Sequence, residues 1–204
     1  MPRPAARRGR SRGRTIGDAG RDGCPGAAAH WTVGAGKTTV AAEINDLLAE
    51  RQIRNAAIDL DALAWQWPPD SRWNEALTFE NLAALWPNYR RRGVTHLVLA
   101  RVLEDRAELD SYRAALAVDD TTVCRLLAPE GTRSSRLIGR MPAGPSLDWH
   151  LARTLELDAA LDDARVEDFT VANDDRAPRT VALDVVTRAG WLPAPPSVRR
   201  TSPR

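Results

Sequence analysis

Lysine is almost absent from this sequence. The chain has 204 residues and 29 basic side chains, of which Lys37 is the only lysine; the other 28 are arginine. Arginine presents a planar fork of donors, whereas lysine presents a compact ammonium group on a flexible stem. A chain that otherwise uses arginine therefore retains lysine at a position where a point charge is needed and a guanidinium group fits poorly.

Cysteine and histidine are scarce as well. Cys24 and Cys124 are far apart and have no metal-ligand spacing, which favours free thiols in a reducing cytoplasm. His30, His96 and His150 are scattered, which argues against a zinc site or a histidine-based catalytic triad. No apolar run is long enough to cross a membrane. We therefore expect a cytoplasmic protein without a membrane partner.

A surplus of positive charge is found only near the N-terminus. Residues 1–23 contain seven arginines and two aspartates, whereas the whole chain has a formal net charge of +2. The remainder is slightly acidic, so no basic surface supports a nucleic-acid partner. We predict a disordered Arg/Gly-rich arm over 1–31, one domain over 32–192 and a disordered tail over 193–204. Whether the chain forms a homodimer is left open.

The most informative stretch surrounds the lone lysine and reads Gly34-Ala35-Gly36-Lys37-Thr38-Thr39. It supplies the second half of the phosphate-binding pattern Gly-x-x-x-x-Gly-Lys-Ser/Thr, the P-loop. Glycines let backbone N–H groups turn inward around an anion, and the helix that follows points its positive end at the same phosphates. The lysine charge reaches the β- and γ-phosphates, and the Thr38 hydroxyl is a ligand for Mg²⁺. We therefore expect all six residues to bind ATP with Mg²⁺.

One position departs from that pattern, because Trp31 occupies the place of the first glycine. The residues before it, 24–30, do not read as a hydrophobic strand. Read one base later, codons for Cys-Pro-Gly-Ala-Ala-Ala-His-Trp can encode Val-Leu-Val-Leu-Leu-Leu-Thr-Gly, a buried strand that ends in the missing glycine. One hypothesis is a frame error upstream of Thr32, which the nucleotide sequence would settle. The alternative is a genuine but degenerate P-loop.

Beyond the loop, helical and strand patterns alternate. Val40, Ile44, Leu47 and Leu48 share one face of the first helix. This alternation predicts an α/β protein with the three-layer P-loop NTPase fold, in which a parallel sheet carries helices on both faces. The predicted helices are 40–53, 78–92, 104–117, 129–140, 147–164 and 178–189, and the predicted strands are 55–60, 95–100, 121–128 and 166–172.

Two aspartates follow the strand that comes after the first helix. Asp59 and Asp61 are two residues apart, so they share a face if the strand continues that far. In a phosphate-binding domain they could bind Mg²⁺, the role expected for Asp59 together with Thr38, or take a proton from an acceptor hydroxyl. The alternative is a solvated strand end at which Asp61 caps a short helix.

Other candidates lie further along the chain. Arg133, Arg136 and Arg140 form one helical stripe beside the Pro/Gly-broken segment 141–145, the arrangement of a closing lid. We expect Arg136 and Arg140 to act on the transferred phosphoryl group, although a solvated basic face would read the same way. Weaker candidates for an anionic substrate are Arg101 and Arg106. The aromatic residues of the loop 65–73 either line an acceptor pocket or serve only in packing; they are Trp65, Trp67 and Trp73.

These residues together resemble the small P-loop kinases, and among them the adenylyl-sulfate kinases most. The stretch from Gly34 to Thr39 resembles their Gly-Ala-Gly-Lys-Ser-Thr, and Ile58-Asp59-Leu60-Asp61 is similar to their Leu-Asp-Gly-Asp, whose carboxylates face the acceptor. The overall pattern over 32–192 also resembles small actinobacterial ATP-binding proteins of the AAA ATPase-like kind. The sequence departs from the kinases at Leu60 and Ala62, which stand in place of Gly and Asn. It departs again at 100–102, where those kinases carry a Ser-Pro turn.

The sequence and the resemblance together predict an ATP-dependent kinase. Lys37 would bind the transferred phosphate, Asp59 or Asp61 would orient the acceptor, and the acceptor itself would be a small molecule of unknown identity. Two alternatives come from other classes of protein. One is a nucleotide-binding regulator or non-kinase ATPase, which the missing Ser-Pro turn favours. The other is a copy made inactive by Trp31.

Overall fold

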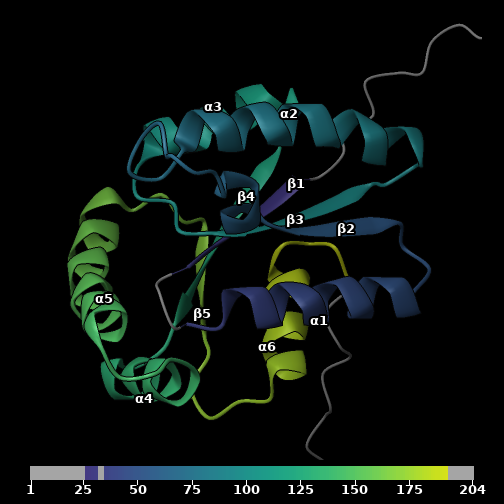
Figure 1. Ribbon diagram of the computed structural model, residues 1–204. Helices are drawn as coiled ribbons and strands as arrows, with labels where there is room; N and C mark the ends of the chain where they lie inside the picture. The colour runs from purple at the N-terminus through teal and green to yellow at the C-terminus, as the bar shows by residue number, and fades with distance from the viewer. Residues whose placement is uncertain (1–25, 32–34, 193–204) are drawn as a thin grey trace, which may run out of the picture.

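The computed structural model describes residues 26–31 and 35–192, which are organised around a parallel five-stranded sheet (Figure 1). Its strands lie in the order β2-β3-β1-β4-β5, so β1 is central and the chain crosses over it between β3 and β4. This order makes the carboxyl end of β1 a topological switch point, where ligands bind in open α/β sheets. The strands are β1 (Gly26–Trp31), β2 (Asn55–Asp59), β3 (His96–Arg101), β4 (Thr121–Leu127) and β5 (Phe169–Ala172).

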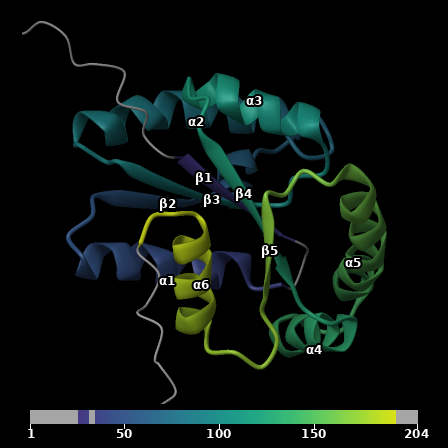
Figure 2. The ribbon, with the colours of Figure 1, turned by 180° about the vertical axis from the view of Figure 1, so that it is seen from behind.

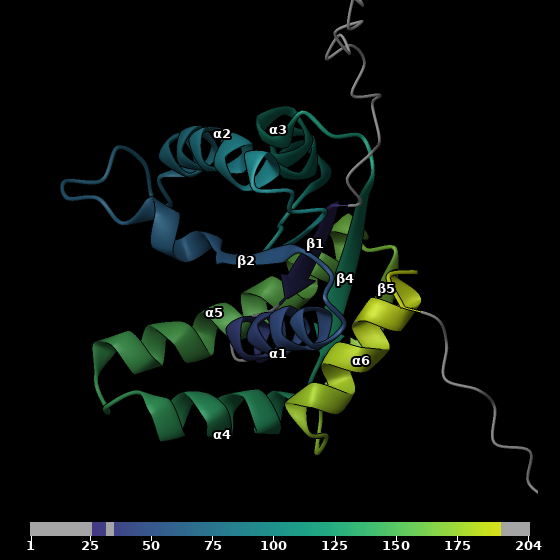
Figure 3. The ribbon, with the colours of Figure 1, turned by 90° about the vertical axis from the view of Figure 1, so that its right-hand side faces the viewer.

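Helices cover both faces of this sheet, as the sequence predicted, and the α/β class is confirmed. α2 and α3 lie on one face, and α1 and α6 lie on the other (Figures 1 and 3). Two further helices, α4 and α5, stand to one side of these layers. The helices are α1 (Lys37–Glu50), α2 (Glu75–Arg91), α3 (Arg106–Leu116), α4 (Glu130–Arg140), α5 (Pro145–Ala164) and α6 (Pro178–Arg188), with the short 3₁₀ helix η1 (Leu60–Ala64) after β2.

The first strand differs from the expectation. Gly26–Trp31 lies within the span 1–31 that the sequence predicted as an arm, yet it forms the central strand and pairs in parallel with β3 and β4. An alanine-rich stretch carries a weak strand signal, because its side chains bury little apolar area. Strand pairing uses backbone N–H and C=O groups, however. A strand between β3 and β4 forms backbone hydrogen bonds with a neighbour on each side. Residues 1–25 of the predicted arm and the predicted tail 193–204 lie outside the described residues.

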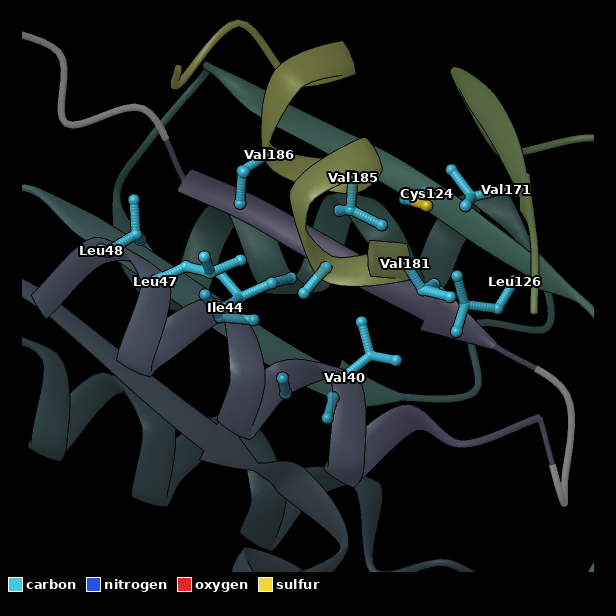
Figure 4. Packing of buried hydrophobic residues seen from close by; sticks show 14 of the residues in the cluster. Val40, Ile44, Leu47, Leu48, Cys124, Leu126, Val171, Val181, Val185 and Val186 are labelled. Carbon is cyan, nitrogen blue, oxygen red and sulfur yellow. The ribbon is translucent and has the colours of Figure 1, made fainter. Parts of the chain in front are cut away.

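The core beside the phosphate-loop candidate is built by α1 and α6. The predicted apolar face of α1 is confirmed: Val40, Ile44, Leu47 and Leu48 are all buried. Figure 2 shows α1 and α6 side by side on one face of the sheet, and Figure 4 shows their side chains meeting those of β4 and β5. Because protein cores are close-packed, this contact fixes the start of α1 relative to the strand ends. The first helix begins three residues earlier than the predicted 40–53, at Lys37.

α4 and α5 form a helical hairpin around residues 141–144, close to the predicted break at 141–145 (Figure 3). The guanidinium group of Arg133 on α4 is buried and forms an ion pair with Asp158 on α5, which ties the two helices together. Leu137 and Leu157 are also buried. Within residues 35–192, no helix is long and apolar enough to cross a membrane.

Candidate functional site

The parallel sheet brings the predicted site residues to one edge. Because all five strands run the same way, their carboxyl ends lie together. The segment that connects β1 to α1 starts at this edge. The same edge carries Asp59 at the end of β2 with Asp61 just beyond it, Arg101 at the end of β3 and Asn173 after β5. These groups are distant in sequence and meet only through the order of the strands.

The described part of the phosphate-loop candidate is a glycine turn that leads directly into α1. Gly36 precedes α1 with φ of +90°, a left-handed conformation that favours glycine. Lys37, Thr38 and Thr39 form the first turn of α1, where backbone N–H groups lack intrahelical partners. The peptide dipoles also give this end of the helix a partial positive charge. An anion is therefore favoured here; Gly34 lies outside the described residues.

Asn173 supports this turn, and sequence analysis missed it. Its side chain is buried, and Nδ2 donates a hydrogen bond of 2.6 Å to the carbonyl oxygen of Ala35. Its own backbone N–H donates to the carbonyl of Leu127, at the end of β4. Asn173 thus connects the ends of β4 and β5 to the loop before α1. The available signal was its position directly after a predicted strand, because polar residues at carboxyl strand ends face the ligand side.

Replacing Gly36 with alanine should distort the loop. A Cβ atom at Gly36 would lie 2.8 Å from Nδ2 of Asn173, and φ of +90° is strained for any L-residue. We expect a loss of about 1–2 kcal/mol in the free energy of unfolding, from the strain alone, measured by urea denaturation. Adding Asn173→Ala should recover part of the contact cost in a double-mutant cycle. Gly139→Ala is the control, because its Cβ meets open space in a helix, and equal losses in both variants would contradict the argument.

Lys37 extends from α1 towards charged groups of both signs. Its residue is half-buried, and burial lowers the pKa of its ammonium group below the ordinary 10.5. The carboxylates of Asp61 and Asp59 oppose this shift, while Arg140 adds to it. Desolvation penalises a charged group unless an opposite charge compensates, so an anion at the start of α1 would stabilise the charged lysine.

Thr38 and Asp59 are in direct contact, as a shared metal site would require. The Thr38 hydroxyl donates a hydrogen bond of 2.7 Å to Oδ2 of Asp59. The other carboxylate oxygen, Oδ1, accepts the backbone N–H of Asp61 and caps η1. The capping residue is therefore Asp59 rather than Asp61, which the sequence had offered as the alternative cap. Hydroxyl and carboxylate oxygens are the ligands that Mg²⁺ prefers, so this pair fits the ion.

Asp61 lies on the wall of a cavity, and its side chain is 63% exposed. Its nearest cationic partner is Arg101, with 4.0 Å between Oδ1 and Nη1. Arg101 is 12% exposed and also contacts Glu108, at 3.5 Å, and the hydroxyl of Thr78, at 3.3 Å. Burial raises the pKa of Glu108 even though Arg101 opposes the shift. Of the two aspartates, Asp61 is thus the more accessible one. The guanidinium group of Arg101, by contrast, is fixed by its contacts with Glu108 and Thr78.

The three arginines of α4 have different surroundings. The buried guanidinium group of Arg133 forms an ion pair with Asp158 on α5 and therefore does not face the site. Arg136 donates from Nη2 to the carbonyl oxygen of Asn173, at 3.1 Å. Its Nη1 is buried without a hydrogen-bond partner and would lie 3.9 Å from a Cβ at Gly36. Arg140 is exposed on the cavity wall with Lys37. The structure therefore places Arg136 and Arg140, but not Arg133, beside the first turn of α1.

These groups surround a cavity of about 820 Å³, a size ordinary for a small-molecule site. It runs from residues 36–39 past Asp61 to the loop before α2 and to α5. Trp65 and Trp73 line it, but Trp67 is 90% exposed and is not among its lining residues. Arg101 also lines it, and Arg106 does not. Sequence analysis missed Trp149, Arg153 and Glu108, which come from helices whose orientation sequence periodicity does not define.

No protein-family model matches the sequence, and no curated protein matches it either. Solved structures do match. A gluconokinase from Sinorhizobium meliloti 1021 has a TM-score of 0.55 at 19% identity, over 82% of this chain and 93% of that one. A shikimate kinase from Acinetobacter baumannii, in complex with shikimate, has a TM-score of 0.55 at 17% identity, with the same coverage. The tunicamycin resistance protein of Deinococcus radiodurans has a TM-score of 0.55 at 20% identity, over 84% and 99%.

Together with the parallel sheet and the turn before α1, these matches define the fold. The chain has the three-layer P-loop NTPase fold that the sequence predicted. Its structural neighbours include P-loop kinases of small molecules, and the matched regions span almost the whole of each neighbour. Identities this low establish the fold alone, so the activity has to be argued from the site of this chain.

Proposed function

We propose that this protein is a kinase that transfers the γ-phosphoryl group of Mg²⁺-ATP to the hydroxyl group of a small molecule. The observation that carries the proposal is the cavity of about 820 Å³, which joins the first turn of α1 to Asp61 and to a further space lined by residues of α2, α3 and α5. An ATPase needs room for water beside the γ-phosphate, whereas this space accommodates an organic acceptor as well. The likeness to a gluconokinase and a shikimate kinase supports the same reading.

In this proposal each group of the chain has a separate role. Lys37 and the N–H groups at the start of α1 bind the phosphates. Asp61 orients the acceptor hydroxyl and accepts its proton, while the acceptor oxygen forms a bond to the γ-phosphorus. The bond between that phosphorus and the bridging oxygen breaks, and ADP leaves with the electron pair. Arg136 and Arg140 stabilise the negative charge of the transferred group. Positioning and electrostatics supply nearly all of such catalysis.

Mg²⁺ fits the Thr38–Asp59 pair. The two side chains already meet through hard oxygen atoms, and Thr38 stands next to the lysine. Within the described residues no cluster of three or more histidine, cysteine or acidic side chains could hold a metal alone. Two protein ligands suit an ion that arrives with a nucleotide, because Mg²⁺ commonly takes one or two protein ligands and completes its coordination shell with phosphates and water. When bound, the ion would neutralise charge on the phosphates.

The resemblance to adenylyl-sulfate kinases suggests one specific acceptor, adenylyl sulfate. It rests on the loop residues and on the Asp59-Leu60-Asp61 pattern, in which Asp59 ends β2 and Asp61 belongs to η1. The second candidate is a non-kinase ATPase or nucleotide-dependent regulator, which the departure at residues 100–102 favours. In the structure Arg101 is held by Glu108 and Thr78 at that position.

Incubation with Mg²⁺ and γ-labelled ATP tests the proposal. We expect label to move to a small acceptor when adenylyl sulfate, gluconate, shikimate, amino sugars and amino alcohols are offered separately. Release of labelled phosphate alone, at the same rate with and without every acceptor, would reject the kinase in favour of the ATPase. Absence of any ATP-dependent rise in Tm with Mg²⁺ present would reject both activities and leave an inactive copy.

A further inference from the structure

The acceptor side of the cavity is acidic. We define the acceptor side as the cavity-lining residues other than 36–39 and Arg140, which belong to the phosphate end. Its charged members comprise five carboxylates and three guanidinium groups. The carboxylates are Asp61, Glu75, Glu104, Asp105 and Glu108, and the guanidinium groups are Arg72, Arg101 and Arg153. The acceptor side has two more carboxylates than guanidinium groups and favours positive charge, whereas Lys37 and Arg140 make the phosphate end favour negative charge.

Two of the three guanidinium groups are already committed to carboxylates of the protein. Arg101 contacts Glu108 and Asp61. Arg153, 13% exposed, forms an ion pair with Glu104 and a second one with Glu156, at 3.1 Å. A carboxylate or phosphate on the acceptor would have to break these pairs, and separating a largely buried pair leaves an uncompensated charge. Recognition of an anionic acceptor through Arg101 or Arg153 would therefore be costly, and Arg72, the third guanidinium group, lies over the ring of Trp73.

Two of the five carboxylates, by contrast, form no close ion pair with the described residues, and the charge of Arg101 acts on Glu75 only from beyond 4.0 Å. Within residues 35–192, no arginine, lysine or histidine lies within 4.0 Å of the carboxylate of Glu75 or of Asp105. Glu75 accepts a hydrogen bond from the hydroxyl of Ser71, and Asp105 accepts the backbone N–H of Glu108 as the cap of α3. Each of these carboxylates can accept further hydrogen bonds, because an ionised carboxylate offers about four lone-pair sites.

Aromatic rings complete this side of the cavity. Trp73, before α2, and Trp149, on α5, have ring centroids 5.9 Å apart. The guanidinium group of Arg72 lies 4.9 Å from the Trp73 ring and that of Arg153 lies 5.7 Å from it, so the Trp73 ring already contacts cations of the protein itself. Trp65, 86% exposed, and Phe79 lie on the same side. Indole faces and carboxylates together are the chemistry that recognises an ammonium group.

From these observations we infer that the acceptor is a hydroxylated amine, a molecule with a positively charged ammonium group near the hydroxyl that is phosphorylated. This inference rests on the proposed function. The hydroxyl faces Asp61 and Lys37, and the ammonium group lies between the Glu75 or Asp105 carboxylate and the indole wall. The same charges disfavour carboxylate acceptors such as shikimate and gluconate. They also disfavour the anionic adenylyl sulfate, so this inference decides against the acceptor that the sequence resemblance suggests.

Binding of three alcohols that share a phenyl ring and differ in charge tests the inference without any turnover. The probes are phenylalaninol, a cation; 3-phenylpropanol, which is neutral; and 3-phenyllactate, an anion. Each is titrated by calorimetry into the full-length protein with Mg²⁺ and a non-hydrolysable ATP analogue. We expect phenylalaninol to bind at least about tenfold more tightly than phenyllactate, with phenylpropanol between them. Equal affinities, a preference for phenyllactate, or no binding by any probe would overturn the inference.

A matched pair of variants locates the preference. Glu75→Gln keeps the size and hydrogen bonding of the side chain and removes its charge, so it should reduce the ratio between phenylalaninol and phenyllactate severalfold. Glu80→Gln is the control, because Glu80 is exposed on the same helix and does not line the cavity. An unchanged ratio in Glu75→Gln and in Asp105→Asn would contradict the placement. If the charge preference holds but no label is transferred to amines, the proposed kinase fails while the inferred ligand class stands.

Discussion

Replacing Lys37 with methionine should lower kcat for phosphoryl transfer by about 10³-fold or more. Methionine keeps the length of the side chain and its apolar stem, so the packing at the start of α1 is retained while the charge is lost. That charge lies between Asp61, Asp59 and Arg140, at the phosphate end of the cavity. No other lysine of the chain can substitute for it. Single-turnover rates with γ-labelled ATP measure the loss separately from nucleotide binding.

Lys37→Arg serves as a control that keeps the positive charge but replaces the ammonium group with a guanidinium group. If the compact shape matters, this variant should also lose most activity, since a guanidinium fork is wider than an ammonium group. The pH dependence of ATP affinity gives a second readout. Burial lowers the pKa of Lys37 below the ordinary 10.5, and a bound triphosphate favours the charged form. The affinity for ATP should therefore fall as the pH rises through this lowered pKa, at a pH below 10.5. The arginine variant should lack this decline, and wild-type turnover in Lys37→Met would refute the assignment.

Replacing Asp59 with asparagine should lower kcat by about 10²- to 10³-fold and raise the Mg²⁺ concentration needed for half-maximal activity. Asparagine can still accept the hydrogen bond from Asp61 N–H and cap η1, because it caps as well as aspartate does. The fold is therefore expected to survive, and the lost charge is the variable under test. An Mg²⁺ activation curve at saturating ATP measures the effect.

Asp61→Asn distinguishes the two carboxylates. Asp61 is the more exposed group on the cavity wall, so this variant should lose turnover while its Mg²⁺ requirement stays that of the parent protein. Thr38→Ser keeps the hydroxyl that contacts Asp59 and should keep most activity. Unchanged turnover in both aspartate variants, or identical Mg²⁺ shifts in both, would remove the separate roles proposed for them.

The elements with a clear periodic pattern were predicted to within a few residues. The second strand, predicted at 55–60, is Asn55–Asp59, and the last helix, predicted at 178–189, is Pro178–Arg188. Their buried residues are Ala56 and Ile58 in the strand and Val181, Ala182, Val185 and Val186 in the helix, at the spacing of each element. Local pattern and tertiary structure therefore favour the same element. The strand Gly26–Trp31 was missed because a run of alanines gives little strand signal and only its neighbours provide its pairing.

Site residues were predictable where a motif or strand end marks them. The turn around Gly36 and the contact of Thr38 with Asp59 follow from the loop pattern and the strand after the first helix. Asn173 could not be found in this way, because its contact with Ala35 joins residues 138 positions apart. Nor could the helical stripe show that Arg133 pairs with Asp158 while Arg136 reaches the turn. A stripe defines one face of a helix but not the partner opposite it.

The unique lysine has a practical consequence. Apart from its α-amino terminus, the chain presents a single primary amine, and that amine is half-buried at the phosphate end of the cavity with a lowered pKa. An acyl-phosphate derivative of ATP, which acylates amines close to a bound nucleotide, would therefore add one acyl group per molecule at a known atom. The mass shift of the intact chain would then report site occupancy directly, and competing nucleotides could be ranked without any knowledge of the acceptor.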